Sequence, residues 1–484
     1  MTFINSIFKE VLNDIKPTQK DIVFIDEIVE KLKTLIDEKA QQLNIKYTKI
    51  EPQGSTGIKQ TQLKNDFDID LFVGLNYEFY KPKYSGLSRN KLKKESKKDF
   101  LKLCKEWIIK SLTLKEFHNP QLLYAEHPYV TVDYFAAHQK VKVDIVLFFD
   151  LDLEIINDYG PVTAVDRSPW HSLFIKNELT EEQKDDVRVL KQFFKANHSY
   201  GDKSPVGKVG FIGYSAELLI CHYGSLQNLF SNFNLLKDNP IDFHNRTIND
   251  LGKIHHFKND YLIITDPIDK NRNVASAISE KAYNYCNQRI KDFLKHPGKQ
   301  FFSIEEIPEI NISTIEKSFV DNIFIVELKN ENTDVHYTIN RDKLYSIGDR
   351  IKINGEKEIS HAERFGIIEF EVYFETESDE YCIAIYCENP EIKETYIRRG
   401  PPSKDRAHSN KFIQKNPNFF EEDDYLWVKT VRKYSRFEEF LENFVNSKIS
   451  DNLRVVNLSN SKKTMTRLGK RGIYVLVNMI LPFK

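Results

Sequence analysis

The sequence contains few cysteines, no long apolar run and almost no net charge. Its five cysteines include no Cys-x-x-Cys pair, which argues against a zinc site and favours free buried thiols in a reducing compartment. No stretch of about 18 uncharged apolar residues occurs, so we expect no membrane span. Residues 1–13 lack a basic start and an apolar core, so we expect no signal peptide and a cytoplasmic protein.

Charge is nearly balanced, at −1 over 484 residues, but it is unevenly distributed. Between Arg89 and Lys115 there are ten basic and three acidic residues. A second basic stretch near the C-terminus contains Lys462, Lys463, Arg467, Lys470 and Arg471. A nearly neutral chain of this kind can still present a positive face to nucleic-acid phosphates. A solvated helix face is the alternative explanation for each single run.

The spacing of apolar residues predicts an α+β protein with a mixed sheet and helices behind it. Helical spacing covers residues 3–45, interrupted at Pro17 with Thr18 as a cap, and it returns at 89–115, 180–197, 213–230, 274–294 and 437–444. Strand-like runs occur at 46–53, 67–75, 122–134, 140–149, 323–328, 367–374 and 381–386. The stretch 398–402, Arg-Arg-Gly-Pro-Pro, predicts a turn or a boundary.

Residues 54–75 carry the most informative pattern in the chain. Gly54-Ser55 is followed, thirteen residues after the serine, by Asp68-Ile69-Asp70 and an apolar run. A strand sends residues i and i+2 to one side, so Asp68 and Asp70 would face the same way, about 7 Å apart. Their carboxylates suit one or two Mg²⁺ ions, and the Gly-Ser turn offers N–H groups to phosphates. The pattern predicts nucleotidyl transfer, although Asp-x-Asp alone is common in surface turns.

Asp144 is the third acidic candidate. It interrupts the apolar run 143–149, and alternation places it with Lys142 and Val146 on the face opposite Val143 and Ile145. Burying such a carboxylate without a partner is costly. We therefore expect it to complete a three-carboxylate site and to accept the proton of an attacking hydroxyl; a capped or salt-bridged acid is the alternative.

Further along the chain, four polar residues are candidates for nucleotide contacts. His171 lies in a polar loop after the predicted sheet, and Lys191 leaves the apolar stripe of its helix, with Tyr200 nine residues later. A structural histidine and a plain surface lysine are the alternatives. Arg272 follows Asp269 and Asn271 in a turn; it has the fork of donors that reads a base edge, while the acid and the amide suit a helix N-cap equally well.

Several segments between about residues 50 and 295 resemble the archaeal-type (class I) CCA-adding tRNA nucleotidyltransferases, of the polymerase-β-like superfamily. They occur in the family's order. They are Gly54-Ser55…Asp68-Ile69-Asp70, Tyr124-Ala125-Glu126-His127-Pro128-Tyr129, Val143-Asp144-Ile145-Val146, the run from Thr163 to His171, the run from Asp186 to Phe193, Gly210-Phe211-Ile212-Gly213-Tyr214, and Asp266-Pro267…Arg272-Asn273-Val274-Ala275. Gly-Ser…Asp-x-Asp marks the whole superfamily, and the later segments are more specific.

The resemblance implies a palm-like head at 1–158, a helical neck that binds nucleotide at 159–295, and a body and tail at 296–484 that bind tRNA. It implies a two-metal Mg²⁺ site at Asp68, Asp70 and Asp144, and stepwise addition of C, C and A to the tRNA acceptor end from CTP and ATP. The residues that match the family's nucleotide contacts are Gly54, Ser55, Lys59, Ser168, His171, Lys191, Tyr200 and Arg272.

The chain departs from the family pattern at three places. Ile58 stands where the family usually has arginine, and Lys59 is predicted to replace it as a point charge without the bidentate fork. Ile212 replaces a serine. Residues 300–400 show little of the pattern. These departures bear on RNA binding and the three-step cycle more than on nucleotidyl transfer.

Two other functions stay open at this stage. A related enzyme could make a cyclic or linear oligonucleotide signal or extend another RNA end. A non-catalytic RNA-binding module could retain the fold, although the intact set of Asp68, Asp70 and Asp144 argues against it. The sequence also leaves open how many of the three nucleotides are added and whether the protein is a homodimer; it indicates no obligate protein partner.

Overall fold

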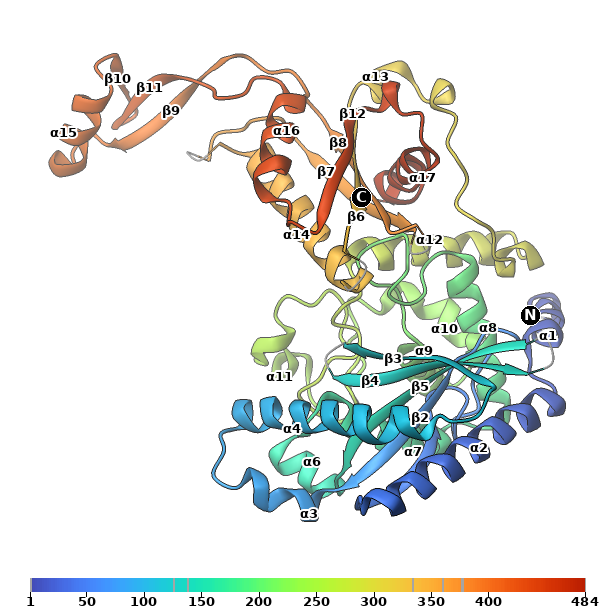
Figure 1. Cartoon of the computed structure of the whole chain (residues 1–484). Coiled ribbons are helices and arrows are strands. Elements are labelled where there is room, and N and C mark those ends of the chain that lie inside the picture. The colour runs from blue at the N-terminus through green and yellow to red at the C-terminus, as the bar shows by residue number, and fades with distance from the viewer. Residues whose placement is uncertain are drawn as a thin grey trace. The chain divides into compact units, whose positions relative to one another are not determined.

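The computed structural model describes residues 2–124, 127–136, 139–332, 335–358, 361–375 and 378–483. Ala125 and Glu126 of the family-like motif lie outside this set. The chain divides into two compact units (Figure 1): unit 1 comprises Met1–Tyr200, Phe211–Ile278 and Arg289–Ile304, and unit 2 comprises Gly201–Gly210, Ser279–Gln288 and Glu305–Lys484. The finer division at residues 158 and 295 remains a prediction.

Unit 1 is built on a five-stranded sheet with the order β1-β2-β5-β4-β3. The strands are β1 (Tyr47–Gln53), β2 (Ile69–Asn76), β3 (Phe117–Tyr124), β4 (Pro128–Ala136) and β5 (Gln139–Asp150). The central pair β2 and β5 is parallel, and every other pair is antiparallel. The predicted α+β class with a mixed sheet is therefore confirmed.

Helices cover one face of this sheet. The helix α2 (Gln19–Leu43) begins at Thr18, whose side chain and that of Asp21 form a reciprocal capping box. The basic run is helical from Arg89 to Ser111, as α4 (Arg89–Leu103), a π-helical turn and α5 (Ile109–Ser111). The side chains of Phe100 and Trp107 are fully buried in one core with α2 and the strands. The predicted apolar face of the basic helix is thus confirmed.

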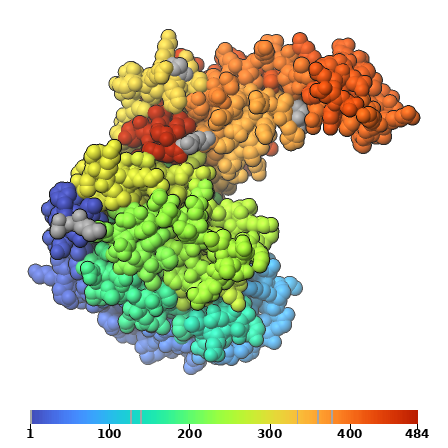
Figure 2. Space-filling view, turned by 180° about the vertical axis from the view of Figure 1, so that it is seen from behind, coloured from blue at the N-terminus to red at the C-terminus, as the bar shows by residue number. Residues whose placement is uncertain are grey.

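Most of the remaining helices of unit 1 follow the last strand of the sheet, β5, along the chain; α1 and α3 come before it. They are α1 (Thr2–Ile15), α3 (Tyr77–Tyr80), α6 (Leu153–Tyr159), α7 (Ser168–Glu178), α8 (Glu181–Ala196), α9 (Gly213–Tyr223), α10 (Leu226–Asn232) and α11 (Ile248–Gly252), and α12 (Glu280–Lys295) extends across both units. In Figure 2, which views the molecule from behind, the green part of the surface belongs to the stretch of chain that contains α9, α10 and α11.

Two predicted helix boundaries in this region are wrong. Residues 213–230 form two helices because Gly224 has a φ of +75°, which ends α9. The predicted helix at 274–294 begins only at Glu280. The side chain of Asn273 forms hydrogen bonds with the backbone of Leu262, Ile264 and Ala275. These tertiary bonds keep the residues before Glu280 out of the helix.

Unit 2 contains two antiparallel sheets. The larger has the order β12-β6-β8-β7 and the smaller β10-β11-β9. The strands are β6 (Ile323–Asn330), β7 (Ile368–Glu375), β8 (Glu380–Cys387), β9 (Thr395–Pro402), β10 (Phe419–Glu422), β11 (Tyr425–Val431) and β12 (Leu453–Asn460), with helices α13 (Lys317–Val320), α14 (Tyr337–Glu356), α15 (Arg406–Lys415), α16 (Phe437–Lys448) and α17 (Arg467–Val475). The strands predicted at 323–328, 367–374 and 381–386 are confirmed.

Of the two interpretations of 398–402, a turn or a boundary, the turn is wrong, because these residues belong to β9, which pairs with β11 and ends at Pro402. β9 is an edge strand, and an edge strand tolerates proline because one side of it needs no ladder hydrogen bond. All five cysteines are free, four of them buried and Cys221 half-buried. Within the described part of the chain, no helix combines the length and the apolar character that a membrane span requires.

Candidate active site

A cavity of about 410 Å³ lies in unit 1, on the sheet face opposite α2 and α4. Side chains of β2, β4 and β5 form one side of it, and α7, α9 and two loops form the other. The predicted site residues that line it are Gly54, Lys59, Asp70, Asp144, Ser168, His171 and Arg272. Ser55, Asp68, Lys191 and Tyr200 are outside its lining.

Asp70 and Asp144 stand opposite each other on the parallel strands β2 and β5. Alternation along β5 is as predicted: Val143 and Ile145 are buried in the core, and Asp144 faces the cavity. Asp68, however, precedes the first residue of β2 and is exposed. The prediction that both aspartates of the motif lie within the strand is therefore wrong, because regular pairing begins only at Ile69.

The negative charge of the Asp70 and Asp144 carboxylates is only partly compensated by neighbouring lysines. Burial, and then the charges of Asp144 and Asp68, raise the pKa of Asp70 to about 7. Asp144 accepts a hydrogen bond of 2.8 Å from Lys142 Nζ at Oδ2, while its Oδ1 is buried and has no partner among the described residues. Gly54 lies so close that a Cβ there would be 2.2 Å from Asp70 Oδ2.

This donor set fits a divalent cation. Two facing carboxylates, one with an unpartnered oxygen, are hard ligands of the kind that Mg²⁺ takes. In the described residues no group of three or more acidic, histidine or cysteine side chains converges as a complete metal site. Asp70 and Asp144 are therefore the pair that the geometry offers, with Asp68 beside them.

Two buried lysines lie on the opposite side of the cavity: Lys59 lines it, and Lys191 stands outside the lining beside Lys59. Lys191 of α8 leaves the apolar stripe as predicted, yet it is only 3% exposed, so the alternative of a plain surface lysine is wrong. Its Nζ donates to the backbone oxygen of Thr61 at 3.1 Å, to Thr61 Oγ1 at 3.0 Å and to Glu217 Oε1 at 3.3 Å. Lys59 Nζ is 2.8 Å from Glu217 Oε2. Burial, together with Lys59 and Arg188, lowers the pKa of Lys191 to about 8 although Glu217 raises it.

Asp266 gathers a second set of donors. Its Oδ2 is 2.8 Å from His171 Nε2 and accepts a hydrogen bond of 2.8 Å from Arg272 Nη1. Its Oδ1 accepts a bond of 3.3 Å from the hydroxyl of Tyr214. Burial lowers the pKa of His171, outweighing Asp266, and the pKa of Asp266 stays well below its usual value because His171 and Arg272 outweigh burial. The alternative of a helix N-cap at Asp269 or Asn271 is wrong, since the next helix, α12, begins only at Glu280.

Comparison with known proteins identifies the chain. It is 30% identical to a CCA-adding enzyme of Methanocaldococcus jannaschii, over 96% of this chain and 95% of the relative. It is 31% identical to a CCA-adding enzyme of Methanococcus maripaludis, with 92% of each chain covered.

The chain belongs to the family of CCA-adding enzymes. The model of the tRNA nucleotidyltransferase second domain matches residues 185–303, and that of the CCA-adding enzyme C-terminal domain matches residues 333–454. The predicted family and the predicted enzyme class, a tRNA nucleotidyltransferase, are confirmed. The C-terminal half, which showed little of the pattern at 300–400, is also covered by the family match. A solved structure of Cid1, described by its RNA terminal uridylyl transferase activity, covers 63% of this chain with 15% identity and a TM-score of 0.46.

Two of the three departures of this CCA-adding enzyme from the family pattern lie at the cavity. Lys59, one residue after Ile58, lines the cavity, and its Nζ is 4.9 Å from the centroid of the Tyr214 ring. Ile212 also lines the cavity and precedes α9. The Tyr214 ring in turn packs on His171, with ring centroids 4.5 Å apart.

Tyr200 and Lys191 both approach the first residue of α9. A Cβ at Gly213 would be 3.1 Å from the Tyr200 hydroxyl and 3.5 Å from Lys191 Nζ. Ser168 begins α7 and lines the cavity, whereas the backbone oxygen of Ser55 accepts a hydrogen bond of 3.0 Å from the Thr61 N–H. The structure thus places Tyr200 near Lys191, and it places Ser55 in the loop after β1, outside the cavity lining.

Sequence reasoning missed the two acids that hold this wall, Glu217 and Asp266. Asp266 belongs to one of the family-like segments, but the sequence indicates no role for it. Glu217 lies three residues after Tyr214 in an otherwise apolar helix. An isolated carboxylate is costly to bury. The presence of Glu217 in an apolar helix was therefore the signal that it pairs with a buried cation.

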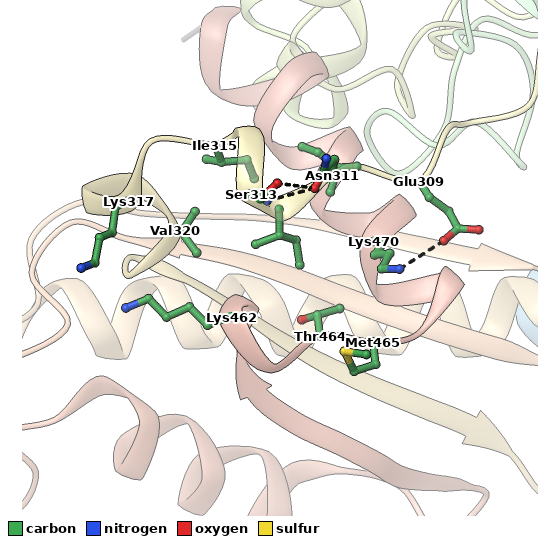
Figure 3. A pocket seen from close by; sticks show the side chains of 12 residues that line it. Glu309, Asn311, Ser313, Ile315, Lys317, Val320, Lys462, Thr464, Met465 and Lys470 are labelled. Carbon is green, nitrogen blue, oxygen red and sulfur yellow. Dashed lines mark hydrogen bonds and ion pairs between the residues drawn. The ribbon is translucent and has the colours of Figure 1, made fainter.

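Four residues of the C-terminal basic stretch form two groups in unit 2. Arg467 and Arg471 pair with Glu306 and Glu375. Three lysines instead line a second cavity, of about 690 Å³ (Figure 3). They are Lys462 and Lys470 of the basic stretch and Lys317 of α13. Thr464 also lines this cavity, and its Oγ1 is buried without a partner among the described residues.

Proposed function

We propose that this enzyme uses the cavity of unit 1 to add C, C and A in turn to the 3′ end of tRNA, with CTP and ATP as substrates and pyrophosphate as the second product. The observation that carries this proposal is a cavity with two facing carboxylates on one side and paired cations on the other. Kinship over nearly the whole length with CCA-adding enzymes supports the tRNA acceptor end as the substrate.

Asp70 and Asp144, with Asp68 beside them, would hold Mg²⁺ in a two-metal site. Bound Mg²⁺ would polarise the phosphate under attack and neutralise charge on the leaving pyrophosphate. Lys142 and Lys59 offset only part of the repulsion between the two carboxylates, since the pKa of Asp70 stays raised to about 7, which supports a cation between them. The unpartnered Oδ1 of Asp144 is the acceptor for the proton of the attacking 3′-hydroxyl.

The cationic wall would bind the nucleotide. Lys59 and Lys191 supply positive charge to the triphosphate, and Gly54-Ser55 supplies backbone N–H groups. His171 and Tyr200 contact phosphate or ribose. Arg272 gives one nitrogen to Asp266 and has donors left for a base edge. Charge that is fixed before the substrate arrives costs no reorganisation as negative charge moves to pyrophosphate.

Exposed lysines would bind the rest of the tRNA. The basic helix from Arg89 and the cavity lysines of unit 2, Lys462 and Lys470, are candidates for phosphate contacts, which need positive charge and no particular sequence.

An extension assay on three tRNA substrates tests the proposal. The substrates end at the discriminator base, after C and after CC, and labelled CTP or ATP is supplied with Mg²⁺. We expect C, C and A to be added in order, and no incorporation by the double variant Asp68→Ala/Asp70→Ala. The matched control is Asp66→Ala, which removes an exposed acid of the same loop.

Two results would contradict the proposal. Full incorporation by the double variant would remove the carboxylates from the reaction. A soluble oligonucleotide formed from the four nucleoside triphosphates without RNA, with no extension of tRNA, would indicate the alternative enzyme that makes an oligonucleotide signal.

A further inference from the structure

Glu217 is a buried acid that the proposed function leaves without a role. It lies on α9 and is 1% exposed, and it does not line the cavity. The rest of α9 is largely apolar, with Ala216, Leu218, Leu219 and Ile220 fully buried around it. Taking a carboxylate out of water is costly unless partners surround it.

Each oxygen of this carboxylate has a partner. Oε2 is 2.8 Å from Lys59 Nζ. Oε1 accepts a hydrogen bond of 2.6 Å from Thr61 Oγ1 and one of 3.3 Å from Lys191 Nζ. Thr61 Oγ1 also accepts a bond of 3.0 Å from Lys191. One carboxylate therefore ties two lysines, from a loop and from α8, into a single buried cluster.

The cluster has a surplus of one positive charge. Lys59 and Lys191 would repel each other in this buried region if no acid stood between them. With Glu217 present, this repulsion is reduced in the free protein, while one net positive charge remains for an anionic ligand. Lys59 reaches the cavity lining directly.

We propose that Glu217 is a positioning residue for the triphosphate, which fixes Lys59 and Lys191 side by side behind the cavity. The inference rests on the proposed function of these two lysines as triphosphate ligands. Glu217 acts through the lysines and has no contact of its own with substrate.

A pH dependence follows from this arrangement. The charged or titratable groups that surround Lys191 are Glu217 on α9, Lys59 in the loop and Arg188 on α8 itself, with the Tyr200 hydroxyl nearby. Glu217 raises the pKa of Lys191, whereas burial, Lys59 and Arg188 lower it to about 8. Replacing Glu217 by a neutral residue removes the opposing acid. Lys191 should then lose its proton at lower pH, and nucleotide affinity should fall at lower pH than in the wild type.

The test compares Glu217→Gln with the wild type in the full chain. Binding of ATP and CTP is measured without RNA by calorimetry between about pH 6.5 and about pH 9, alongside KM and kcat for tRNA extension. We expect about tenfold weaker nucleotide binding at pH 8 and a tenfold higher KM, about 1.4 kcal/mol, with kcat changed less than threefold. We also expect the alkaline loss of binding to begin about one pH unit lower.

Two further variants separate positioning from folding. Glu371→Gln is the matched control, because Glu371 is also a buried acid near a lysine, Lys281, but lies in unit 2; it should lower Tm without changing nucleotide KM. Thr61→Val removes only the hydroxyl between Glu217 and Lys191, and should weaken nucleotide binding about threefold even if Glu217→Gln does not fold.

The outcomes are distinct. Unchanged affinity and pH profile in Glu217→Gln and in Thr61→Val, with only a lower Tm, would overturn the inference. The triple variant Lys59→Met/Lys191→Met/Glu217→Gln should bind nucleotide no worse than Lys59→Met/Lys191→Met; an additional loss would mean that Glu217 acts independently of the lysines. If the wild type binds ATP with this dependence but extends no tRNA, the proposed function fails and the inference stands.

Discussion

Lysines lie at a cavity in each unit of this enzyme, but the two cavities hold the positive charge differently. In unit 1 the side chains of Lys59 and Lys191 are 9% and 4% exposed, and their common partner Glu217 is 2% exposed. In unit 2 the side chains of Lys462 and Lys470 are 47% and 31% exposed, and each pairs with a separate acid near the surface.

The difference indicates what each cavity is suited to bind. Buried charges have one geometry, because losing a partner strands a charge away from water. Exposed pairs contribute about 0–1 kcal/mol and rearrange readily. A rigid buried set suits the triphosphate of a small nucleotide, whose reacting phosphorus must be held in place. Exposed lysines suit an RNA backbone, which needs attraction more than exact placement.

The largest effect should come from the carboxylate side of the unit 1 cavity. We expect Asp144→Asn to lower incorporation of CTP and ATP at least about a thousandfold, because it removes both a cation ligand and the proton acceptor. Asp133→Asn on the neighbouring strand β4 is the control, since Asp133 pairs with Lys140 away from the cavity lining. Single-turnover rates measure both variants, and a loss below tenfold for Asp144→Asn would contradict its role.

The next effect should come from breaking a buried ionic group on the cationic side. Asp266→Asn should lower kcat/KM for both nucleotides by about thirtyfold, because Arg272 and His171 lose the acid that orients them, about 2 kcal/mol. The pKa of Asp266 is depressed in the folded state, so its contribution to stability exists above the unfolded pKa and is lost as pH falls below it.

Melting curves check the second half of this prediction. The Tm deficit of Asp266→Asn should be full at pH 7 and should shrink as the pH falls below about 4. A deficit that stays constant with pH would mean that the Asp266 charge contributes nothing.

Much of the fold could be predicted from sequence because apolar periodicity reports burial directly. Helix α2 with its Thr18 cap and the alternation along β5 are of this kind. The failures have tertiary causes. The break at Gly224 depends on a left-handed backbone, the late start of α12 depends on hydrogen bonds from Asn273, and β9 depends on pairing with β11.

The candidate site divides in the same way. Local motifs predict Asp70, Asp144, His171 and Arg272, and all of them line one cavity. The pairing of Lys59 with Glu217 joins residues 158 positions apart. No local pattern states which buried acid meets which buried lysine, so the organisation of the cationic wall required the structure.

The repulsion between the carboxylates should also lower the free energy of unfolding of the metal-free protein. The raised pKa of Asp70, about 7, means that the folded state holds this proton more tightly than the unfolded state. Stability is therefore lost as pH rises from the unfolded pKa towards 7. Asp70→Asn should raise stability at pH 8 by about 1–2 kcal/mol, with a smaller gain near pH 5.

Chemical denaturation with chelator present measures this gain. Added Mg²⁺ should then raise the Tm of the wild type more than that of Asp70→Asn, because the cation relieves a repulsion that the variant lacks. A less stable Asp70→Asn protein at pH 8 would show that the carboxylate is compensated within the fold.

The smallest effect should come from the exposed lysines of unit 2. Lys462→Met/Lys470→Met should weaken tRNA binding about threefold at moderate salt and lower the slope of log K against log salt by up to about 2, since each lost phosphate contact removes about 0.9. Lys33→Met/Lys39→Met on α2 is the control for loss of two surface charges. Nucleotide KM should not change, because the triphosphate site is a different cavity. A tRNA affinity and salt slope equal to those of the control would show that the lysines of unit 2 do not contact RNA.

A changed nucleotide KM would show that the two cavities do not act separately. The comparison of the two units assumes that they do.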